Sequence, residues 1–296
     1  MTHQSQSQTG SAVQKAPTLS VYRHLWGLDG SWSDWLPKIK AAGYVGVEGM
    51  PPAAAERAAF RAELDALGLD FVAQIVTCWP CTGGNADEHF RSFQEQVDAA
   101  MHLRPVFFNS HSGVDMWPLS ESRTFLKHVV AWQDRNQLDV GHETHRGRIF
   151  FNPRDTLQLA ADFPSLRFTA DFSHWVNVCE RIVDDDTLGL SALAPRIRHI
   201  HARVGYEQGP QVPDPRAPEY DRHVVAHERW WSAIWKARHA AGDTQFSLTP
   251  EFGPPDYQHT LPYSRIQVAD PWEVSLWMAQ RQRQRFAALE ALIHLP

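Results

Sequence analysis

Short apolar runs of strand length alternate along this 296-residue chain with longer segments of helical periodicity. The alternation repeats eight times. It predicts a parallel sheet, because two parallel neighbouring strands need a helix-sized connection between them. Eight strand-helix units in one chain predict a closed (β/α)8 barrel, the TIM barrel. A doubly wound open sheet is the alternative, but no glycine-rich nucleotide-binding motif follows the first apolar run.

The boundaries of these units follow from glycine, proline and capping residues between the periodic segments. Strands are predicted at or near residues 19–23, 44–47, 69–76, 105–109, 138–143, 166–170, 196–200 and 246–248. Helices are predicted from Ser31 or Ser33 to Gly43, over 52–67, 87–102, 120–136, from Pro153 or Asp155, and over 188–193, 219–241 and 271–293.

Two regions differ in composition. Residues 1–17 are rich in Gln, Ser and Thr and lack a basic start followed by an apolar stretch. We predict a disordered tail there and no secretory signal. Residues 18–296 are predicted to form one barrel domain, since such barrels commonly occupy about 250 residues.

Charge and cysteine content narrow the classes of partner. Lys and Arg number 28 against 34 Asp and Glu, a net charge of -6, without a basic run, so we predict no nucleic-acid partner. No apolar segment approaches the ~20 residues that cross a bilayer, so no membrane partner is expected. Cys78, Cys81 and Cys179 are too few for a disulfide framework, which predicts a reducing, cytoplasmic location. Cys78 and Cys81 have redox-motif spacing but no second pair for zinc. The oligomeric state is not predicted, and a homo-oligomer is compatible with the sequence.

Polar side chains gather at the ends of the predicted strands, which meet at one mouth in a parallel barrel. They are His24, Glu48, Gln74, Asn109, His111, Glu143, His145, Asp171, His174, His201, Arg203 and Glu251. Three carboxylates and one imidazole from four strand ends suit one divalent ion such as Mn²⁺, Co²⁺, Mg²⁺ or Zn²⁺. We predict that its ligands are Glu143, Asp171, His201 and Glu251. Strand alternation puts His199 on the same face as His201, so the pattern alone does not separate them, although His201 lies nearer the mouth.

Aromatic residues and one long loop also follow the strands. Trp26, Trp79, Trp117 and Trp175 could wall a pocket for a polyhydroxylated ligand, or simply pack their loops. We include Trp26 and Trp175 among the predicted substrate-binding residues, together with His111 and His145. The loop 202–218 contains four prolines, with Gly205 and Gly209 as hinges, and is predicted to close as a lid.

The order of these residues resembles a known family. Glu143, then Asp171 with His174 three positions later, His199-x-His201, and Glu251 within Thr-Pro-Glu-Phe-Gly-Pro resemble the xylose-isomerase-like (AP endonuclease 2) superfamily. Within it, the chain is similar to the sugar isomerase/epimerase group that includes the ketohexose 3-epimerases. The resemblance implies that Glu143, Asp171, His201 and Glu251 bind the metal, that both glutamates move protons, and that His174 and Arg203 contact substrate. Arg203 follows the histidine by two residues, whereas the epimerases place an arginine several residues later.

The function predicted from these residues is a divalent-metal-dependent isomerase or epimerase of a sugar or polyol ketone, acting through an enediolate with two glutamates as acid and base. The alternatives are a dehydratase or lyase on a polyol, a phosphodiesterase like endonuclease IV, and a non-catalytic sugar-binding barrel. A phosphodiesterase is disfavoured, because it needs a cationic track for the nucleic-acid backbone. No cation follows Glu251 closely, which favours a neutral sugar over a sugar phosphate.

Overall fold

The structure, a computed structural model, describes residues 16–80 and 83–293. The tail predicted at 1–17 lies outside the described residues except for its last two positions. Cys81 also lies outside them, so the spacing of Cys78 and Cys81 has no structural counterpart here.

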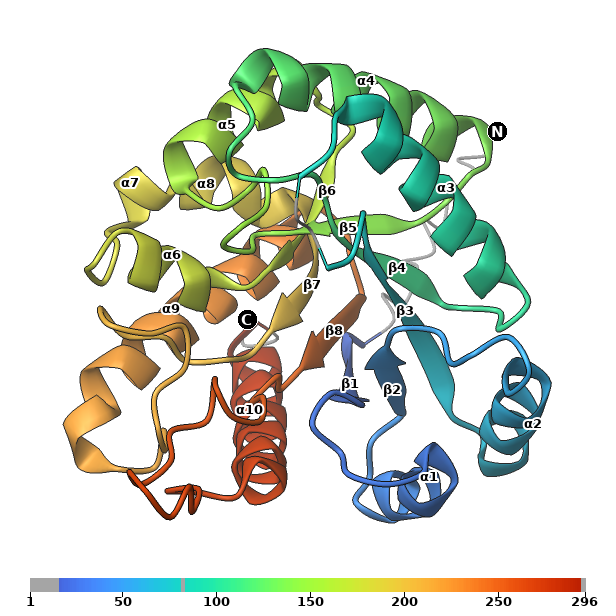
Figure 1. Ribbon diagram of the computed structural model, residues 1–296. Helices are drawn as coiled ribbons and strands as arrows, with labels where there is room; N and C mark the ends of the chain where they lie inside the picture. Colours follow the sequence, from blue (N-terminus) through green and yellow to red (C-terminus); the bar gives the residue numbers. More distant parts are fainter. Residues whose placement is uncertain (1–15, 81–82, 294–296) are drawn as a thin grey trace, which may run out of the picture.

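Eight parallel strands close into a barrel in chain order, and the first strand pairs with the last (Figure 1). The predicted (β/α)8 barrel is therefore confirmed. The strands are β1 Thr18–His24, β2 Gly46–Gly49, β3 Asp70–Val76, β4 Phe107–His111, β5 Val140–Glu143, β6 Arg167–Ala170, β7 Ile197–His201 and β8 Gln245–Thr249.

Helices surround the barrel, as Figure 1 shows. They are α1 Trp32–Ala41, α2 Arg57–Leu67, α3 Ala86–Met101, α4 Leu119–Arg135, α5 Pro153–Asp162, α6 Phe172–Val178, α7 Asp185–Leu188, α8 Leu190–Leu193, α9 Asp221–Ala240 and α10 Pro271–Ile293. Two 3₁₀ turns, η1 Ala194–Arg196 and η2 Pro218–Tyr220, precede β7 and α9. Among the described residues, no helix combines the length and apolar character that crossing a bilayer requires.

Local chemistry explains several of these boundaries. Asn85 accepts hydrogen bonds from two backbone N–H groups at the start of α3, while Glu88 bonds back to the backbone of Asn85. This capping box begins the helix one residue before the predicted start. Gly68 ends α2 in the left-handed conformation, at φ 60°. The predicted start of α2 was wrong: the helix begins at Arg57 rather than at residue 52, and the preceding segment is a turn.

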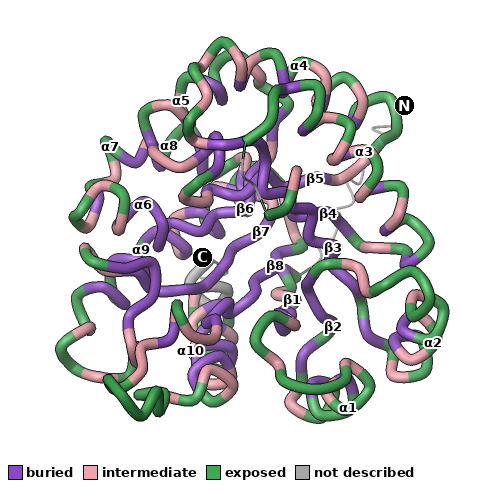
Figure 2. The backbone as a smooth tube through the Cα atoms, in the orientation of Figure 1, coloured by how far each residue is buried: buried purple, intermediate pink, exposed green. Residues whose placement is uncertain are grey.

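The apolar core lies between the barrel and its helices, where Figure 2 shows a buried inner layer and exposed outer helix faces. The inside of the barrel is arranged in layers. Tyr22, Val72 and Phe107 form a small apolar cluster, with Phe107 and Tyr22 packed against His199. Burial raises the pKa of Tyr22 to about 12. Polar side chains follow toward the carboxyl ends of the strands, so the fold concentrates its buried polar groups at the mouth.

Candidate active site

Four side chains from consecutive strand ends converge at the mouth of the barrel. Glu143 ends β5, Asp171 follows β6, His201 ends β7 and Glu251 follows β8. Each is at most 3% exposed, and one potential ligand atom from each lies within 4.8 Å of the others. The structure therefore brings together the four residues predicted as metal ligands, while binding of an ion itself stays a prediction.

Three atoms of this group are buried without a hydrogen bond to any described residue: Glu143 Oε1, His201 Nδ1 and Glu251 Oε2. His201 Nδ1 lies 2.8 Å from Glu251 Oε2, but the two are not aligned for a hydrogen bond. The short distance alone does not make a hydrogen bond, because direction as well as distance defines one. Unsatisfied buried atoms are unfavourable, and oxygen and imidazole donors suit a divalent cation, so this group fits one.

Arg203 reaches the same group from two positions beyond His201. One of its guanidinium nitrogens makes a short contact with Asp171 and lies 3.3 Å from Glu251 Oε2. Burial lowers the pKa of Arg203, but the carboxylates of Asp171 and Glu251 outweigh that effect and raise it. Asp171 is also the cap of α6, because its Oδ1 accepts from the backbone N–H of Ser173 at 3.1 Å. Arg203 therefore offsets part of the negative charge of the carboxylates.

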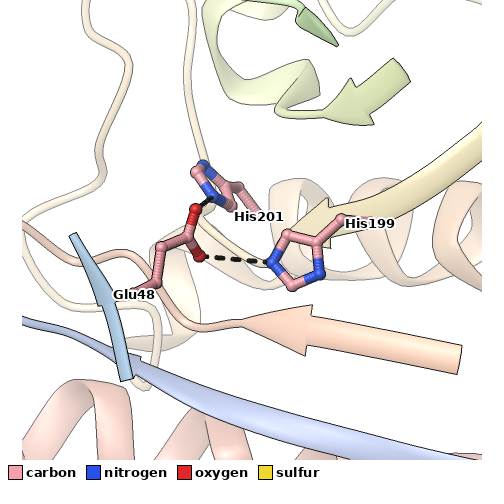
Figure 3. A group of neighbouring side chains, drawn as sticks. All are labelled: Glu48, His199 and His201. Atoms are coloured by element: carbon pink, nitrogen blue, oxygen red, sulfur yellow. Dashed lines mark hydrogen bonds and ion pairs between the residues drawn. The ribbon is translucent and has the colours of Figure 1, made fainter. Parts of the chain in front are cut away.

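Glu48, from β2, fixes the orientation of the His201 ring (Figure 3). His201 Nε2 lies 2.9 Å from Glu48 Oε1. An ionised carboxylate only accepts, so Nε2 carries a proton and Nδ1 is the nitrogen that faces Glu251 and Glu143. His199 instead uses both ring nitrogens in hydrogen bonds, with Ser247 at 2.8 Å and Thr249 at 2.9 Å. The structure thus separates the two histidines, and His201 is the one in the converging group.

Glu48, His199 and His201 form a second group with metal-ligand spacing. Glu48 Oε1 accepts from Asn109 at 3.0 Å besides His201, and its Oε2 accepts from Thr249 at 2.5 Å and faces His199 at 3.3 Å. Both oxygens are therefore occupied, and this group is a complete hydrogen-bond network rather than an open metal site. The sequence predicted that Glu48 and Asn109 lie at strand ends. It could not show that they hold His201 and Glu143 in place, because that role depends on distances across the barrel.

Electrostatics keeps the two glutamates ionised. Burial raises the pKa of Glu251, but the charges of His201 and Arg203 outweigh that effect and lower the pKa to about 2. Burial likewise raises the pKa of Glu143, whereas His111 and His201 hold it well below its usual range. For His201, burial lowers the pKa, and Glu251, Glu48 and Glu143 together raise it well above its usual value, so a bound metal ion would replace the proton on Nδ1. Ionised carboxylates are the form that binds a cation or accepts a proton.

The two glutamates differ in their surroundings. Glu143 Oε2 accepts from Asn109 Nδ2 and from His111 Nε2, each at 2.7 Å. Glu251 instead lines a cavity in the mouth, and its Oε1 lies 3.3 Å from His24 Nε2. Glu143 is thus held by donors, whereas Glu251 faces open space.

Three histidines form a row along one side of the site. The rings of His111 and His145 stack at 4.5 Å between centroids, and His145 and His174 lie 4.0 Å apart. Arg203 donates to His174 Nε2 at 2.8 Å, which requires an unprotonated nitrogen there. Burial lowers the pKa of His145 to about 3 and holds that of His174 well below its usual value. His145 and His174 therefore present neutral imidazoles.

The cavity beside this group has a volume of about 450 Å³. Several of the predicted substrate-binding residues line it: Trp26, His111, His145 and Arg203. His174 contacts Arg203 without lining the cavity itself. Contact with a substrate stays a prediction for all of these residues.

Trp175 lies elsewhere. It belongs to α6, is 0% exposed, stacks on Phe172 at 5.0 Å, and donates from Nε1 to the Phe150 carbonyl at 2.9 Å. Trp175 was expected in a loop after the strand. Asp171 instead caps a helix there, and Trp175 lies on the buried side of that helix. Trp175 is therefore a core residue and not part of the cavity. Trp117 donates to the Gly84 carbonyl at 2.9 Å, which matches the loop-packing alternative.

The predicted lid is packed onto the barrel. Val204 and Val212 in the loop 202–218 are fully buried. A Cβ at Gly205 would lie 2.4 Å from the Ser173 carbonyl oxygen, so glycine permits close backbone contact there rather than a hinge motion. The structure gives no support to the lid interpretation.

Several solved structures have a fold similar to that of this chain. No protein-family model and no curated protein matches the sequence. Among solved structures, an AP endonuclease of family 2 from Brucella melitensis has a TM-score of 0.62 and 15% identity, over 89% of this chain and 98% of that one. The 3-keto-D-glucoside 4-epimerase YcjR from E. coli has a TM-score of 0.59 and 13% identity, over 90% and 100%. The probable 3-DHS dehydratase AsbF from Bacillus anthracis has a TM-score of 0.55 and 14% identity, over 77% and 90%.

At these identities the similarity establishes the fold and not the reaction. The three proteins differ in activity, yet each aligns with most of this chain. Together with the closed barrel, they confirm the fold that the resemblance of the strand-end residues implied. The chain has the fold of the xylose-isomerase-like TIM-barrel proteins.

Proposed function

We propose that the protein holds one divalent metal ion with Glu143, Asp171, His201 and Glu251, and that it isomerises or epimerises a sugar or sugar-like polyol ketone. The convergence of four buried ligand atoms within 4.8 Å, beside a cavity of about 450 Å³, supports this proposal most directly. A bound divalent ion polarises a substrate carbonyl and stabilises the negative charge that develops on its oxygen.

Glu251 is the residue best placed to remove the proton next to that carbonyl. It lines the cavity, and its pKa of about 2 keeps it ionised at neutral pH. Epimerisation also needs a proton on the opposite face of the substrate. Glu143 would serve there together with His111, because His111 lines the cavity and lies 2.7 Å from Glu143.

Substrate hydroxyls would be held by the neighbouring side chains. Neutral His145 offers a ring nitrogen to the cavity, while Arg203 is a cation that already lies on the cavity surface. His174 orients Arg203 through their 2.8 Å hydrogen bond. These groups would position the carbonyl and its neighbouring C–H against Glu251.

A dehydratase acting on a polyol is the second candidate. The observation that favours it is the same asymmetry of the two glutamates: Glu251 lines the cavity and Glu143 does not. One base is enough to remove a proton before a neighbouring hydroxyl leaves. Similarity to the dehydratase AsbF concerns the fold and does not choose between the two reactions.

A nuclease function is less well supported. The chain carries a net charge of -6, and the cavity rim includes exposed Trp26, Met50 and Trp79. A phosphodiester backbone is bound mainly by cationic side chains, which this rim does not concentrate.

Metal analysis followed by a proton-exchange screen tests the proposal. Purified protein is expected to bind about one equivalent of Mn²⁺, Co²⁺, Mg²⁺ or Zn²⁺. Incubated with ketoses and aldoses in deuterated water, the loaded protein is expected to give isomers or epimers that carry deuterium next to the carbonyl. Products that have lost water would favour the dehydratase. No binding of any of these four ions would contradict both reactions.

A further inference from the structure

The cavity at the barrel mouth has two unlike sides. One side is polar and includes Glu251, Arg203 and His111. The other is apolar and is formed by residues at or just after the ends of β1, β2 and β3. We call it the apolar wall, and its members are Leu25, Trp26, Met50, Val76 and Trp79.

The apolar wall is open to solvent inside this cavity. Trp26 is 38% exposed, Met50 46% and Trp79 66%. Single exposed apolar residues are ordinary on protein surfaces, but these three share one concave site with the polar groups. Water against such a wall is released when an apolar group covers it, which favours an apolar ligand group.

Within the apolar wall, Trp26 is held in place by contacts with residues of the polar side. Its backbone N–H donates to His24 Nδ1 at 2.9 Å, and its ring meets Tyr257 edge-on at 4.9 Å. A Cβ at Gly253 would lie 2.1 Å from the Trp26 ring, so this glycine lets the indole pack directly on the backbone after Glu251. A Trp26 ring held in this way can bind without reorganising first.

We propose that the apolar wall is a subsite for an apolar substituent, and that the preferred substrate is a glycoside or similar polyol derivative carrying a ring or alkyl group, with free sugars bound more weakly. The polyol end of this substrate rests on the function proposed above. A free sugar would turn hydroxyl groups toward the wall. Leu25 and Val76 offer a hydroxyl no hydrogen bond, and Met50 offers only a weak acceptor. A hydroxyl that loses water without a new partner is bound unfavourably.

A matched pair of polyol ketones tests this subsite: the methyl and phenyl 3-keto-β-D-glucopyranosides. Their Kd values are measured by calorimetry on the full-length protein loaded with Mn²⁺. We expect the phenyl compound to bind at least about tenfold more tightly, from the apolar area that it buries. Equal Kd values for the two compounds, or no binding of either, would overturn the proposal.

Two substitutions locate the effect on the apolar wall. Met50→Ser and Trp79→Ser are each expected to remove most of the phenyl preference, with a much smaller rise in the Kd of the methyl compound. Met116→Ser is the matched control, because Met116 is 87% exposed and lies outside this cavity. A phenyl preference that survives in both wall variants would place the substituent elsewhere and overturn the subsite.

Failure of the subsite and failure of the proposed function give different results. Exchange of the proton next to the ketone is followed separately by NMR in deuterated water. A phenyl preference without proton exchange keeps the subsite and argues against the proposed reaction. Proton exchange with equal Kd values does the reverse.

Discussion

The two halves of the barrel contribute differently to the mouth. The ends of β5 to β8 supply the four candidate ligands, whereas β1 to β4 supply the groups that hold them. His24 faces Glu251, Glu48 bonds to His201, and Asn109 and His111 donate to Glu143. Asp171 is the exception, since Ser173 and Arg203 hold it from its own half. The comparison shows that a ligand set from one half needs the other half to orient it.

The charged and the apolar linings of the cavity follow the same division. Arg203 and Glu251 come from the second half, whereas the apolar wall comes from the first half, together with the polar His24, Gln74 and His111. A substrate in the cavity therefore meets polar chemistry on one side and an apolar wall on the other.

The largest effect is expected from a ligand of the second half. Asp171→Asn keeps the size of the side chain but removes a charge and one anionic oxygen. We expect loss of stoichiometric metal binding and a fall in kcat beyond the roughly 10⁴-fold upper range for one acid-base group, since the metal is lost too. Metal content and kcat are the measurements. Asp184→Asn, at an exposed helix cap, is the control that keeps both. An Asp171→Asn protein with full metal content would remove Asp171 from the ligand set.

Substituting either glutamate is expected to lower kcat less than Asp171→Asn does, and the two glutamates are expected to differ from each other. Glu251→Gln and Glu143→Gln each lose the base and one anionic oxygen of the predicted ligand set, which lowers kcat by at least roughly 10²–10⁴-fold. Because Glu251 lines the cavity and Glu143 acts beside His111, proton exchange is expected to suffer more in Glu251→Gln. Exchange of the α-proton in deuterated water is the measurement. If Glu143→Gln keeps full turnover, the one-base dehydratase becomes the better proposal.

An intermediate effect is expected from the first half. Glu48→Gln leaves the fold intact but weakens the acceptor that holds the Nε2 proton of His201. Loss of such a partner typically weakens metal binding by about 10–100-fold. Thr249→Val removes one donor to Glu48 and is expected to have a smaller effect on metal affinity. Titration of both variants with Mn²⁺ measures this. If Glu48→Gln and the natural protein bind Mn²⁺ with equal affinity, Glu48 does not support His201 as a ligand.

The smallest effect on activity is expected from Trp175. Trp175→Phe leaves a cavity in the core and removes the donor to the Phe150 carbonyl. We expect the free energy of unfolding to fall by roughly 1–3 kcal/mol, with kcat and KM unchanged. Urea unfolding and steady-state kinetics provide both measurements. A rise in KM at unchanged stability would return Trp175 to the substrate site.

The fold was predictable because its signals are local. Asn85 at the start of α3 and Gly68 at the end of α2 act within a few residues of themselves. Glu143 and Glu251 could be nominated because parallel strands bring their carboxyl ends to one edge.

What escaped prediction depends on distances across the barrel. The hydrogen bond between Thr249 and Glu48 joins residues 201 positions apart, and no local pattern pairs them. The helix that buries Trp175 begins where Asp171 Oδ1 accepts a hydrogen bond from the Ser173 N–H. The sequence does not show whether a carboxylate at a strand end will cap a helix in this way. Gly205 was interpreted as a hinge because a sequence does not show the Ser173 carbonyl against it.

The hydrogen bond between Thr249 and Glu48 also bears on how the protein matures. Strand β8 is made last and pairs with β1, which is made first. A nascent chain that ends before β8 already contains Glu143, Asp171 and His201, but it lacks Glu251 and the hydroxyl that steadies Glu48. Under the proposed function, tight capture of an ion would therefore come late in biosynthesis. Acquisition of the metal would then report that the last strand has docked against the first.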